Sequence, residues 1–249
     1  MFEKNSKAHV ILFALVLSVV CSLLITAAAT GLRARQQDNM ALDKKVNLLR
    51  AAGLVDEGQN PGKETINTLY EQRIEEAVVD RQGKIIETEN ADGMHLYFVH
   101  AKDARDGHDS NDISGYIVPI NTRGLWGKIH GYLAFKNDGQ TVSGFSVFSH
   151  SETPGLGGEI ESAWFQKNFK GKKIFNSQDK FVSIGIAKGK AGDLPKEEQE
   201  NYVDGISGAT LTGRYLSEGI KNTLMKYEGV SVTFRQRQLK AKDGNPSHD

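Results

Sequence analysis

The feature that most constrains this chain of 249 residues is a long uncharged stretch near its beginning. Residues 8–32 contain no Asp, Glu, Lys or Arg over 25 positions. A helix rises about 1.5 Å per residue, so this stretch is long enough to cross a hydrocarbon core of about 30 Å. We therefore expect residues 1–35 to form a single N-terminal transmembrane anchor.

A cleaved signal peptide is the competing interpretation of this stretch, because residues 26–29 include small residues of the kind found at cleavage sites. The apolar region is longer than the about 7–15 residues of a signal peptide, which favours an uncleaved anchor. Lys4 and Lys7 precede the stretch and Arg33 and Arg35 follow it, so the positive-inside rule gives no clear orientation.

The remaining residues have the length and composition of one soluble domain. The 31 basic and 31 acidic residues cancel, so nothing in the charge indicates nucleic acid as a partner. The only cysteine, Cys21, lies in the uncharged stretch. The domain therefore has no disulfide and no Cys-bound zinc or iron–sulfur cluster, and any redox role needs an organic cofactor.

Hydrophobic spacing predicts both helices and strands. Helices are expected near residues 42–53, 66–78 and 159–169, and from Thr210 to about Gly229. Strand-like runs occur at residues 84–87, 94–100, 116–120, 129–135, 141–149, 182–187 and 230–234. Short turns such as residues 137–139 are typical of antiparallel pairing. We predict an α+β domain at residues 36–239, with a mixed, mainly antiparallel sheet covered by helices, and a flexible polar tail at 240–249.

Residues 204–212, Asp-Gly-Ile-Ser-Gly-Ala-Thr-Leu-Thr, are the stretch most informative about function. Apolar residues then recur at spacings of four, four and three, at Leu216, Ile220, Leu224 and Tyr227. A helix should thus begin near Thr210, and the free N–H groups of a helix N-terminus attract phosphate. Gly208 and Ala209 leave the backbone uncovered there. An ordinary cap and turn is the more usual explanation of such a run.

Two commoner motifs do not fit this stretch. A Walker A loop needs G-x-x-x-x-G-K-[ST], and the chain contains neither Gly-Lys-Ser nor Gly-Lys-Thr. Residues 205–209 approach the nucleophile elbow G-x-S-x-G, but Ala209 replaces its last glycine. The elbow also follows a buried strand, and the preceding residues 196–201 are too polar to form one. A serine hydrolase is therefore a poor fit.

Two further segments have features suited to a flat ring. Residues 150–158, His-Ser-Glu-Thr-Pro-Gly-Leu-Gly-Gly, can expose backbone amides, although a glycine-rich connector is equally reasonable. Residues 121–127 offer the aromatic ring of Trp126 and the cation of Arg123, although a tryptophan is more often simply a core residue.

Residues 106–112 are acidic but lack the EF-hand spacing, so we expect a solvated loop and no metal site.

Resemblance to a known family bears on all three segments. Asp-x-x-Ser-Gly-Ala-Thr at 204–210 resembles the flavinylation motif of FMN-binding domains, in which the last Thr carries FMN through a phosphoester bond. The chain resembles the C subunit of bacterial sodium-translocating NADH–quinone reductases over nearly its whole length, and more distantly the G subunit of the Rnf complex. His-x-Glu-Thr-Pro-Gly-Leu-Gly, Arg-Gly-Leu-Trp-Gly and residues 48–54 share in this resemblance.

The resemblance implies one covalent FMN on Thr210 and no catalytic residue of the chain's own. Asp204 would help to position a flavin transferase or its metal. The residues implied as cofactor-binding are Thr210, Asp204, Ser207, Gly208, Ala209, Glu152, Thr153, Leu156, Gly157, Arg123 and Trp126. Among them Thr153 would hydrogen-bond the ring edge, Leu156 would pack on a ring face, and Glu152 would bring a negative charge near the ring.

The resemblance also implies a role, a location and partners. The role is that of an electron-transfer subunit of a sodium-pumping NADH:ubiquinone oxidoreductase, in the bacterial inner membrane with its main domain in the periplasm. Its partners would be the other membrane subunits and a magnesium-dependent flavin transferase. The chain has no G-x-G-x-x-G, so NADH would react on another subunit. An Rnf-type subunit and a cofactor-free periplasmic binding module are the alternatives.

Overall fold

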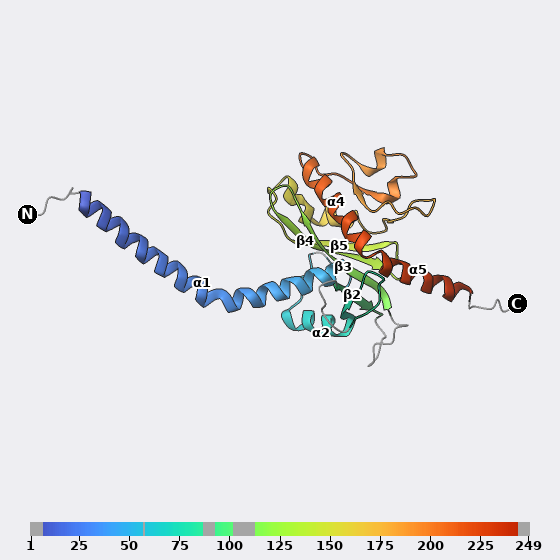
Figure 1. Cartoon of the computed structure of the whole chain (residues 1–249), viewed down its shortest axis with the longest axis horizontal. Helices are drawn as coiled ribbons and strands as arrows, with labels where there is room; N and C mark the ends of the chain where they lie inside the picture. The colour runs from blue at the N-terminus through green and yellow to red at the C-terminus, as the bar shows by residue number, and fades with distance from the viewer. Residues whose placement is uncertain (1–6, 57, 87–92, 102–112, 244–249) are drawn as a thin grey trace, which may run out of the picture. The chain divides into compact units, whose positions relative to one another are not determined.

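Helix α1 (Lys7–Ala51) is the first element of the computed structural model, which describes residues 7–56, 58–86, 93–101 and 113–243. The chain divides into two compact units between Asp43 and Lys44. In the first unit, α1 is exposed along residues 7–41 and is long and apolar enough to cross a membrane (Figure 1). The two helices expected at 8–32 and 42–53 are thus one helix. It ends before Gly53, whose φ of 72° lies in the left-handed region that commonly follows a helix.

The second unit is built on a five-stranded antiparallel sheet, as predicted. Its strands follow one another in the order β1-β2-β3-β4-β5, every neighbouring pair being antiparallel. They are β1 (Ile74–Val79), β2 (Met94–His100), β3 (Ile113–Arg123), β4 (Lys128–Lys136) and β5 (Val142–Ser149). The expected turn between β4 and β5 is present, with Gly139 at a φ of 74°.

Both faces of the sheet are buried. Side chains alternate between the faces of a strand, so on β3 the large core receives Tyr116, Val118 and Ile120 while Ile117 points to the other face. Figure 1 shows α4 (Thr210–Lys226) on one side of the sheet and α2 (Lys63–Arg73) on the other. The expected α+β class with helices covering the sheet is confirmed.

The last turns of α1 belong to the second unit and pack against β5. Leu48 and Leu49 are 2% and 0% exposed, and Asn47 accepts a buried hydrogen bond of 2.7 Å from the Ser146 hydroxyl. A Cβ at Gly144 would overlap the carbonyl oxygen of Ala51. This part of α1 is therefore core structure of the domain.

Helix α4 carries the apolar face that its spacing predicted. Leu216, Ile220 and Leu224 are all buried in the large core. Gly219 lies where α4 approaches β3, and a Cβ at this position would overlap the side chain of Thr122. The helix therefore rests directly on the strand.

Several expected elements differ in the structure. Residues 74–78 were expected to continue a helix but form β1, which pairs along its whole length with β2. Residues 230–234 were expected to be a strand but lie in helix α5 (Glu228–Asp243). Their alternating Val-Ser-Val-Thr-Phe pattern is typical of a strand, yet Val230 and Phe234 also lie one helical turn apart and are both buried. Tertiary packing decided both cases.

Shorter corrections concern segments around the sheet. The run at 84–87 gives only an isolated bridge between Ile85 and Val79, and its last residue lies outside the described ranges. The run at 182–187 is reduced to β6 (Gly185–Ile186), paired in parallel with β7 (Tyr202–Val203), which the pattern missed. The helix expected at 159–169 is a 3-10 helix, η2 (Gly157–Glu161), followed by α3 (Ala163–Lys167).

Boundaries near the end of the chain also moved. Helix α4 ends at Lys226 and α5 begins at Glu228 after the single residue Tyr227, so Gly229 lies inside α5. A Cβ at Gly229 would overlap the carbonyl oxygen of Arg81, so the glycine allows a close contact instead of ending a helix. Helix α5 extends to Asp243, within the tail expected at 240–249. The loop expected at 106–112 lies outside the described residues.

We expect Leu49→Ala to lower the free energy of unfolding by about 2–5 kcal/mol, because it removes a fully buried side chain from the contact between α1 and the sheet. The measurement is denaturant unfolding of the full chain in detergent, followed by tryptophan fluorescence. Met40→Ala is the matched control on the same helix, since Met40 is 61% exposed and should change stability by less than about 0.5 kcal/mol. Equal stability of the two variants would contradict the assignment of this part of α1 to the core.

Candidate functional site

The start of helix α4 presents one exposed hydroxyl and one buried hydroxyl. Thr210 is exposed, whereas Thr212 is 1% exposed. Ala209 is the N-cap residue and no side chain caps the helix by a hydrogen bond. The N-terminal amides of a helix with 17 residues are thus left without a side-chain acceptor, next to the exposed Thr210. This arrangement suits a phosphate group.

The segment before α4, residues 204–209, is hydrogen-bonded to the loop at residues 189–191. The N–H of Gly205 donates to the carbonyl of Gly189 at 2.7 Å, and Asp204 Oδ1 accepts from the N–H of Ala191 at 2.7 Å. Burial holds the pKa of Lys172 below its usual value, and the nearby carboxylate of Asp204 offsets part of this shift. Asp204 is therefore bound to the neighbouring loop, and it supports the turn before Thr210.

Glu152 is the buried group at the centre of the site. Its side chain is 5% exposed, and its two carboxylate oxygens accept from different segments. Oε2 accepts from the Thr212 hydroxyl at 2.6 Å, and Oε1 accepts from the backbone N–H of Trp126 at 3.0 Å. The three segments singled out in the sequence, residues 121–127, 150–158 and 204–212, therefore meet at one carboxylate.

The loop of residues 150–158 turns tightly around Glu152. The carbonyl oxygen of Thr153 accepts from the N–H groups of Leu156 at 3.1 Å and Gly158 at 2.9 Å, so this loop folds back on itself. Gly155 has a φ of 72°, which suits glycine at this Pro-Gly turn. The fold of the loop buries Gly157 and leaves the side chains of Thr153 and Leu156 exposed.

Leu156 links this loop to the segment before α4. Gly208 has a φ of 74°, and a Cβ placed there would come within 2.8 Å of Leu156 Cδ2. Leu156 is nevertheless 44% exposed, so one side of it covers Gly208 and another faces outward. Ser207 and Gly208 are themselves exposed.

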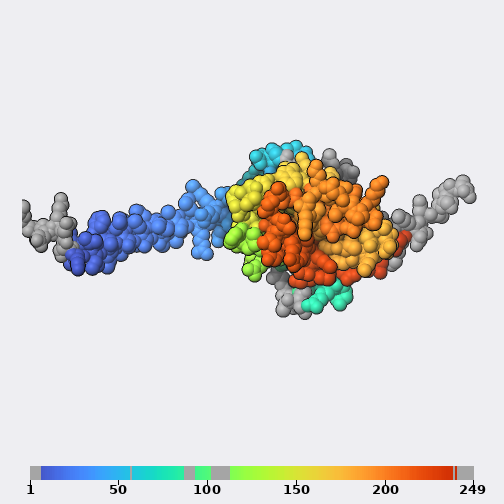
Figure 2. All heavy atoms as spheres, turned by 90° about the horizontal axis from the view of Figure 1, so that it is seen from above, coloured from blue at the N-terminus to red at the C-terminus, as the bar shows by residue number. Residues whose placement is uncertain are grey.

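Exposed apolar side chains are concentrated in these segments. Trp126 is 69% exposed, so the core interpretation of this tryptophan does not hold. The other large apolar side chains exposed on the same segments or close to them in sequence are Leu125, Leu156, Trp164 and Leu211. In the space-filling view of Figure 2, the chain from the end of β5 to α4 forms much of the visible face of the domain. Apolar side chains and an exposed hydroxyl are thus available together.

Not every expected residue joins this centre. Arg123 is exposed at the end of β3, opposite Lys128 in the register with β4. Ala209 is buried and its carbonyl accepts the helix hydrogen bond from Gly213 at 3.0 Å. Arg123 is therefore available to solvent, whereas Ala209 serves the start of the helix.

The chain is similar to known proteins over most of its length. The model of the FMN-binding domain family matches residues 124–225. The C subunit of the Na(+)-translocating NADH-quinone reductase of Vibrio campbellii is 33% identical over 256 residues, covering 92% of each chain. The C subunit of Neisseria meningitidis serogroup B is 30% identical, again covering 92% of each. The chain belongs to the NqrC family, the C subunits of Na(+)-translocating NADH-quinone reductases.

Solved structures of the NqrC family have the same fold. The C subunit from Parabacteroides distasonis matches with a TM-score of 0.65 at 28% identity, over 80% of this chain and 96% of that one. Shewanella oneidensis NqrC matches with a TM-score of 0.62 at 23% identity, over 82% and 99%. The family segment at 124–225 includes every residue of the Glu152 centre.

Sequence reasoning missed one feature of this NqrC-family site. No structural role was expected for Thr212, the last residue of the 204–212 stretch, whereas its hydroxyl donates a hydrogen bond to Glu152, 60 positions away. The helical spacing was the available signal, because Thr212, Leu216 and Ile220 recur every four residues and lie on one buried face. Trp164 and Leu211 were not among the residues implied as cofactor-binding, and only the structure shows that both are exposed.

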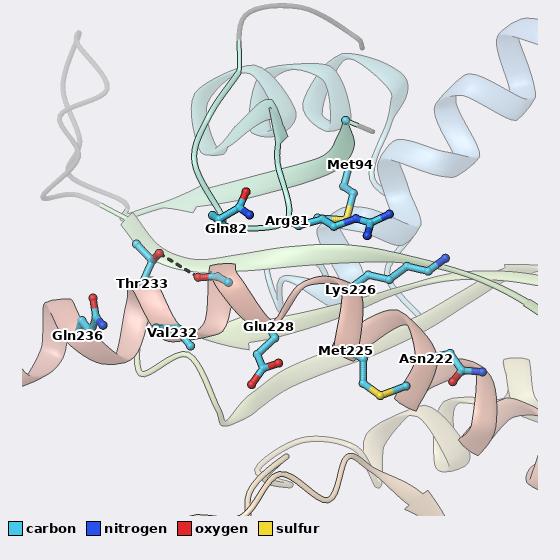
Figure 3. A pocket seen from close by; sticks show the side chains of 12 residues that line it. Arg81, Gln82, Met94, Asn222, Met225, Lys226, Glu228, Val232, Thr233 and Gln236 are labelled. Atoms are coloured by element: carbon cyan, nitrogen blue, oxygen red, sulfur yellow. Dashed lines mark hydrogen bonds between the residues drawn. The ribbon is translucent and has the colours of Figure 1, made fainter. Parts of the chain in front are cut away.

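A separate groove lies at the other end of α4 and includes none of the expected cofactor residues. Figure 3 shows it between the start of α5, the end of α4 and the segment around Arg81 and Met94. Its volume is about 1130 Å³. Lys226, which lines it, is 16 residues along α4 from Thr210, about 24 Å away. This groove is therefore not the site indicated by the motifs.

We expect Thr212→Val to lower the free energy of unfolding by about 1–3 kcal/mol, because a buried carboxylate oxygen of Glu152 loses its donor. Thr210→Val is the matched control in the same turn of α4, and it should change stability by less than about 0.5 kcal/mol because Thr210 is exposed. Denaturant unfolding of the chain made without cofactor measures both. A larger loss for Thr210→Val would contradict this geometry.

Proposed function

We propose that this chain is the membrane-anchored electron-transfer subunit of a sodium-pumping NADH:ubiquinone oxidoreductase, and that it carries one FMN bound covalently to Thr210. The observation that carries the proposal is the exposed hydroxyl of Thr210 at an uncapped helix N-terminus, inside the segment matched by the FMN-binding family model. The names of the family members, which are subunits of NADH-quinone reductases, support the same role.

The residues around Thr210 fit FMN in two ways. The uncapped N-terminal amides of α4 and the helix dipole would stabilise the phosphate that joins Thr210 Oγ1 to the cofactor. The exposed apolar surfaces of Trp126, Leu156 and Leu211 would receive the planar ring. Thr212 is a poor acceptor by contrast, because its hydroxyl is buried and donates to Glu152.

The division of work follows from these residues. FMN supplies reversible electron uptake, and the protein supplies attachment, orientation and surroundings. Thr210 prevents loss of the cofactor from a site that is open to solvent. Leu156 and Trp126 would shield part of the ring from water, since both are exposed at this site. The chain has no dinucleotide-binding G-x-G-x-x-G, so electrons from NADH reach it through another subunit.

Attachment requires a separate enzyme in this proposal. No histidine is adjacent to Thr210 in the sequence to activate its hydroxyl. A magnesium-dependent flavin transferase would let Thr210 Oγ1 attack the FMN phosphorus of FAD, break the phosphoanhydride bond and release AMP, while the hydroxyl proton is removed. The exposed Ser207, Gly208 and Thr210 leave room for such an enzyme to approach.

We further propose that α1 anchors the protein in the inner membrane with its domain in the periplasm. The span of 25 uncharged residues supports anchoring, and family resemblance supports the orientation.

Two alternative functions differ from the proposed one, the first in its electron source and the second in having no cofactor. An Rnf-type subunit would receive electrons that originate from ferredoxin, and a binding module would carry no flavin. A yellow protein whose fluorescence survives denaturing electrophoresis separates the flavoprotein from the binding module.

The attachment site is tested with Thr210→Val, which removes the hydroxyl at nearly constant shape. We expect this variant to fold but to contain no covalent flavin when it is produced together with the transferase. Mass spectrometry of the peptide containing residues 201–214 measures the adduct. Ser207→Ala is the control and should retain it. An adduct that persists in Thr210→Val, or that maps to Ser207 or Thr212, would overturn the assignment.

Anchoring is tested by washing membranes that contain the full chain with high salt and then at alkaline pH. We expect the protein to stay in the pellet, because an apolar span of 25 residues is not released by either treatment. A chain that starts at Arg33 keeps the buried turns of α1 and should stay folded in the supernatant. Release of the full chain, or a mature N-terminus near Thr30, would show that the span is not an uncleaved anchor.

A further inference from the structure

We propose that Glu152 is the positioning residue of the flavin site, which sets where the attachment helix stands relative to the tryptophan that receives the ring. The inference rests on the proposed function for the presence of FMN, but its geometry comes from the contacts of Glu152 alone. Glu152 is 5% exposed, and both oxygens of its carboxylate accept hydrogen bonds from other segments. Glu152 therefore acts through its neighbours.

The first contact holds the attachment helix. Glu152 Oε2 accepts from the Thr212 hydroxyl at 2.6 Å, a short distance typical of a hydroxyl that donates to a carboxylate. Thr212 is in the first turn of α4, two residues after Thr210. Because a helix is rigid over one turn, holding Thr212 also determines the position of Thr210.

The second contact holds the turn that carries Trp126. Glu152 Oε1 accepts from the backbone N–H of Trp126 at 3.0 Å. The turn is closed by a hydrogen bond of 2.7 Å from the N–H of Gly124 to the carbonyl of Gly127. The indole of Trp126 is 69% exposed, so it projects from a backbone that is held in place while its face stays available.

Two glycines leave the space that the carboxylate occupies. A Cβ at Gly124 would overlap Glu152 Oε1, and a Cβ at Gly157 would come within 2.7 Å of Oε2 and 2.6 Å of Thr212 Oγ1. Any side chain at Gly157 would thus push apart the very atoms that form the hydrogen bond. The carboxylate of Glu152 therefore occupies space that the missing side chains of Gly124 and Gly157 leave open.

The backbone of Glu152 is supported from the opposite side. Its N–H donates to His150 Nδ1 at 3.1 Å, and His150 Nε2 lies 3.1 Å from Glu161 Oε2 in the 3-10 helix η2. With Nδ1 accepting, the ring proton is on Nε2 and is donated to Glu161. Glu152 is therefore restrained at both its backbone and its side chain.

Such restraint matters because a cofactor tethered through its phosphate keeps several rotatable bonds between the tether and the ring. The ring has a defined place only if the tether and the receiving surface are fixed relative to each other. Thr210 is the tether and Trp126 is part of the surface, and Glu152 joins the segments of both. Loss of the contact should loosen the ring without breaking the phosphoester bond.

The experiment compares full-length flavinylated protein in detergent for the parent, Glu152→Ala, Glu152→Gln, Thr212→Val and Thr212→Ser. The readouts are the adduct on the 201–214 peptide, the visible circular dichroism of the flavin and its reduction potential. In Glu152→Ala and Thr212→Val we expect the adduct to persist and the dichroism to fall by about half or more. Losing such a hydrogen bond lowers the equilibrium constant for the ordered arrangement by about tenfold. The reduction potential should shift with it.

The conservative variants separate positioning from mere stability. In Glu152→Gln the amide can accept from the Trp126 N–H and donate to Thr212, so the dichroism should return toward the parent value. Thr212→Ser keeps the hydroxyl and should do the same. Gly157→Ala should reproduce the loss by steric overlap, whereas Gly192→Ala should not, because a Cβ there meets no atom within 4 Å.

The outcomes separate this inference from the proposed function. Absence of flavin from Thr210 in the parent would overturn the proposed function. Flavin on Thr210, with parental dichroism and potential in both Glu152→Ala and Thr212→Val, would overturn the positioning role alone. If Glu152→Ala does not fold, the pair Thr212→Val and Thr212→Ser decides the question. A Glu152→Gln variant that behaves like Glu152→Ala would also overturn the hydrogen-bonding role.

Discussion

Helix α4 rests on β3 so closely that a Cβ at Gly219 would overlap the side chain of Thr122. This contact determines the height of the helix above the sheet, and with the buried Leu216 and Ile220 it also determines which face points inward. The N-terminus of the same helix lies near the turn that follows β3, because Glu152 bonds both Thr212 and the backbone N–H of Trp126. The approach of Gly219 to β3 and the hydrogen bonds of Glu152 together place Thr210 and the Trp126 turn in the same region.

Within that region, polar and apolar groups have separate tasks. Glu152, Thr212 and the Trp126 amide form a small buried hydrogen-bond network, and a buried carboxylate is stable only when its oxygens are satisfied. The network holds backbone segments together and exposes apolar side chains at its edge. An open site of this kind suits a carrier whose cofactor has to pass electrons to and from other proteins, provided that the cofactor is covalently retained.

The end of α1 links the apolar span to the folded domain. Leu48 and Leu49 are buried and Asn47 bonds Ser146 on β5, so the helix that contains the apolar span also completes one face of the sheet. Removal of these residues would expose sheet side chains to water. The domain thus depends on the last turns of α1, and the boundary between the two compact units lies within this helix.

Local patterns were sufficient to predict the helix from Thr210 and strands such as 94–100. The apolar face of a helix and the apolar run of a strand both depend on residues that are close together in the sequence. They failed at residues 74–78 and 230–234, where the same residues suit either state and pairing with β2 or burial against the core made the choice. The sequence by itself determined the apolar span, the antiparallel α+β domain and, through motif resemblance, the candidate attachment residue. Only the tertiary structure decided that Thr212 is buried while Thr210 is exposed, and that Glu152 joins segments 60 and 26 residues away. The physical reason is that such hydrogen bonds form between residues distant in the chain, whose proximity depends on the whole fold.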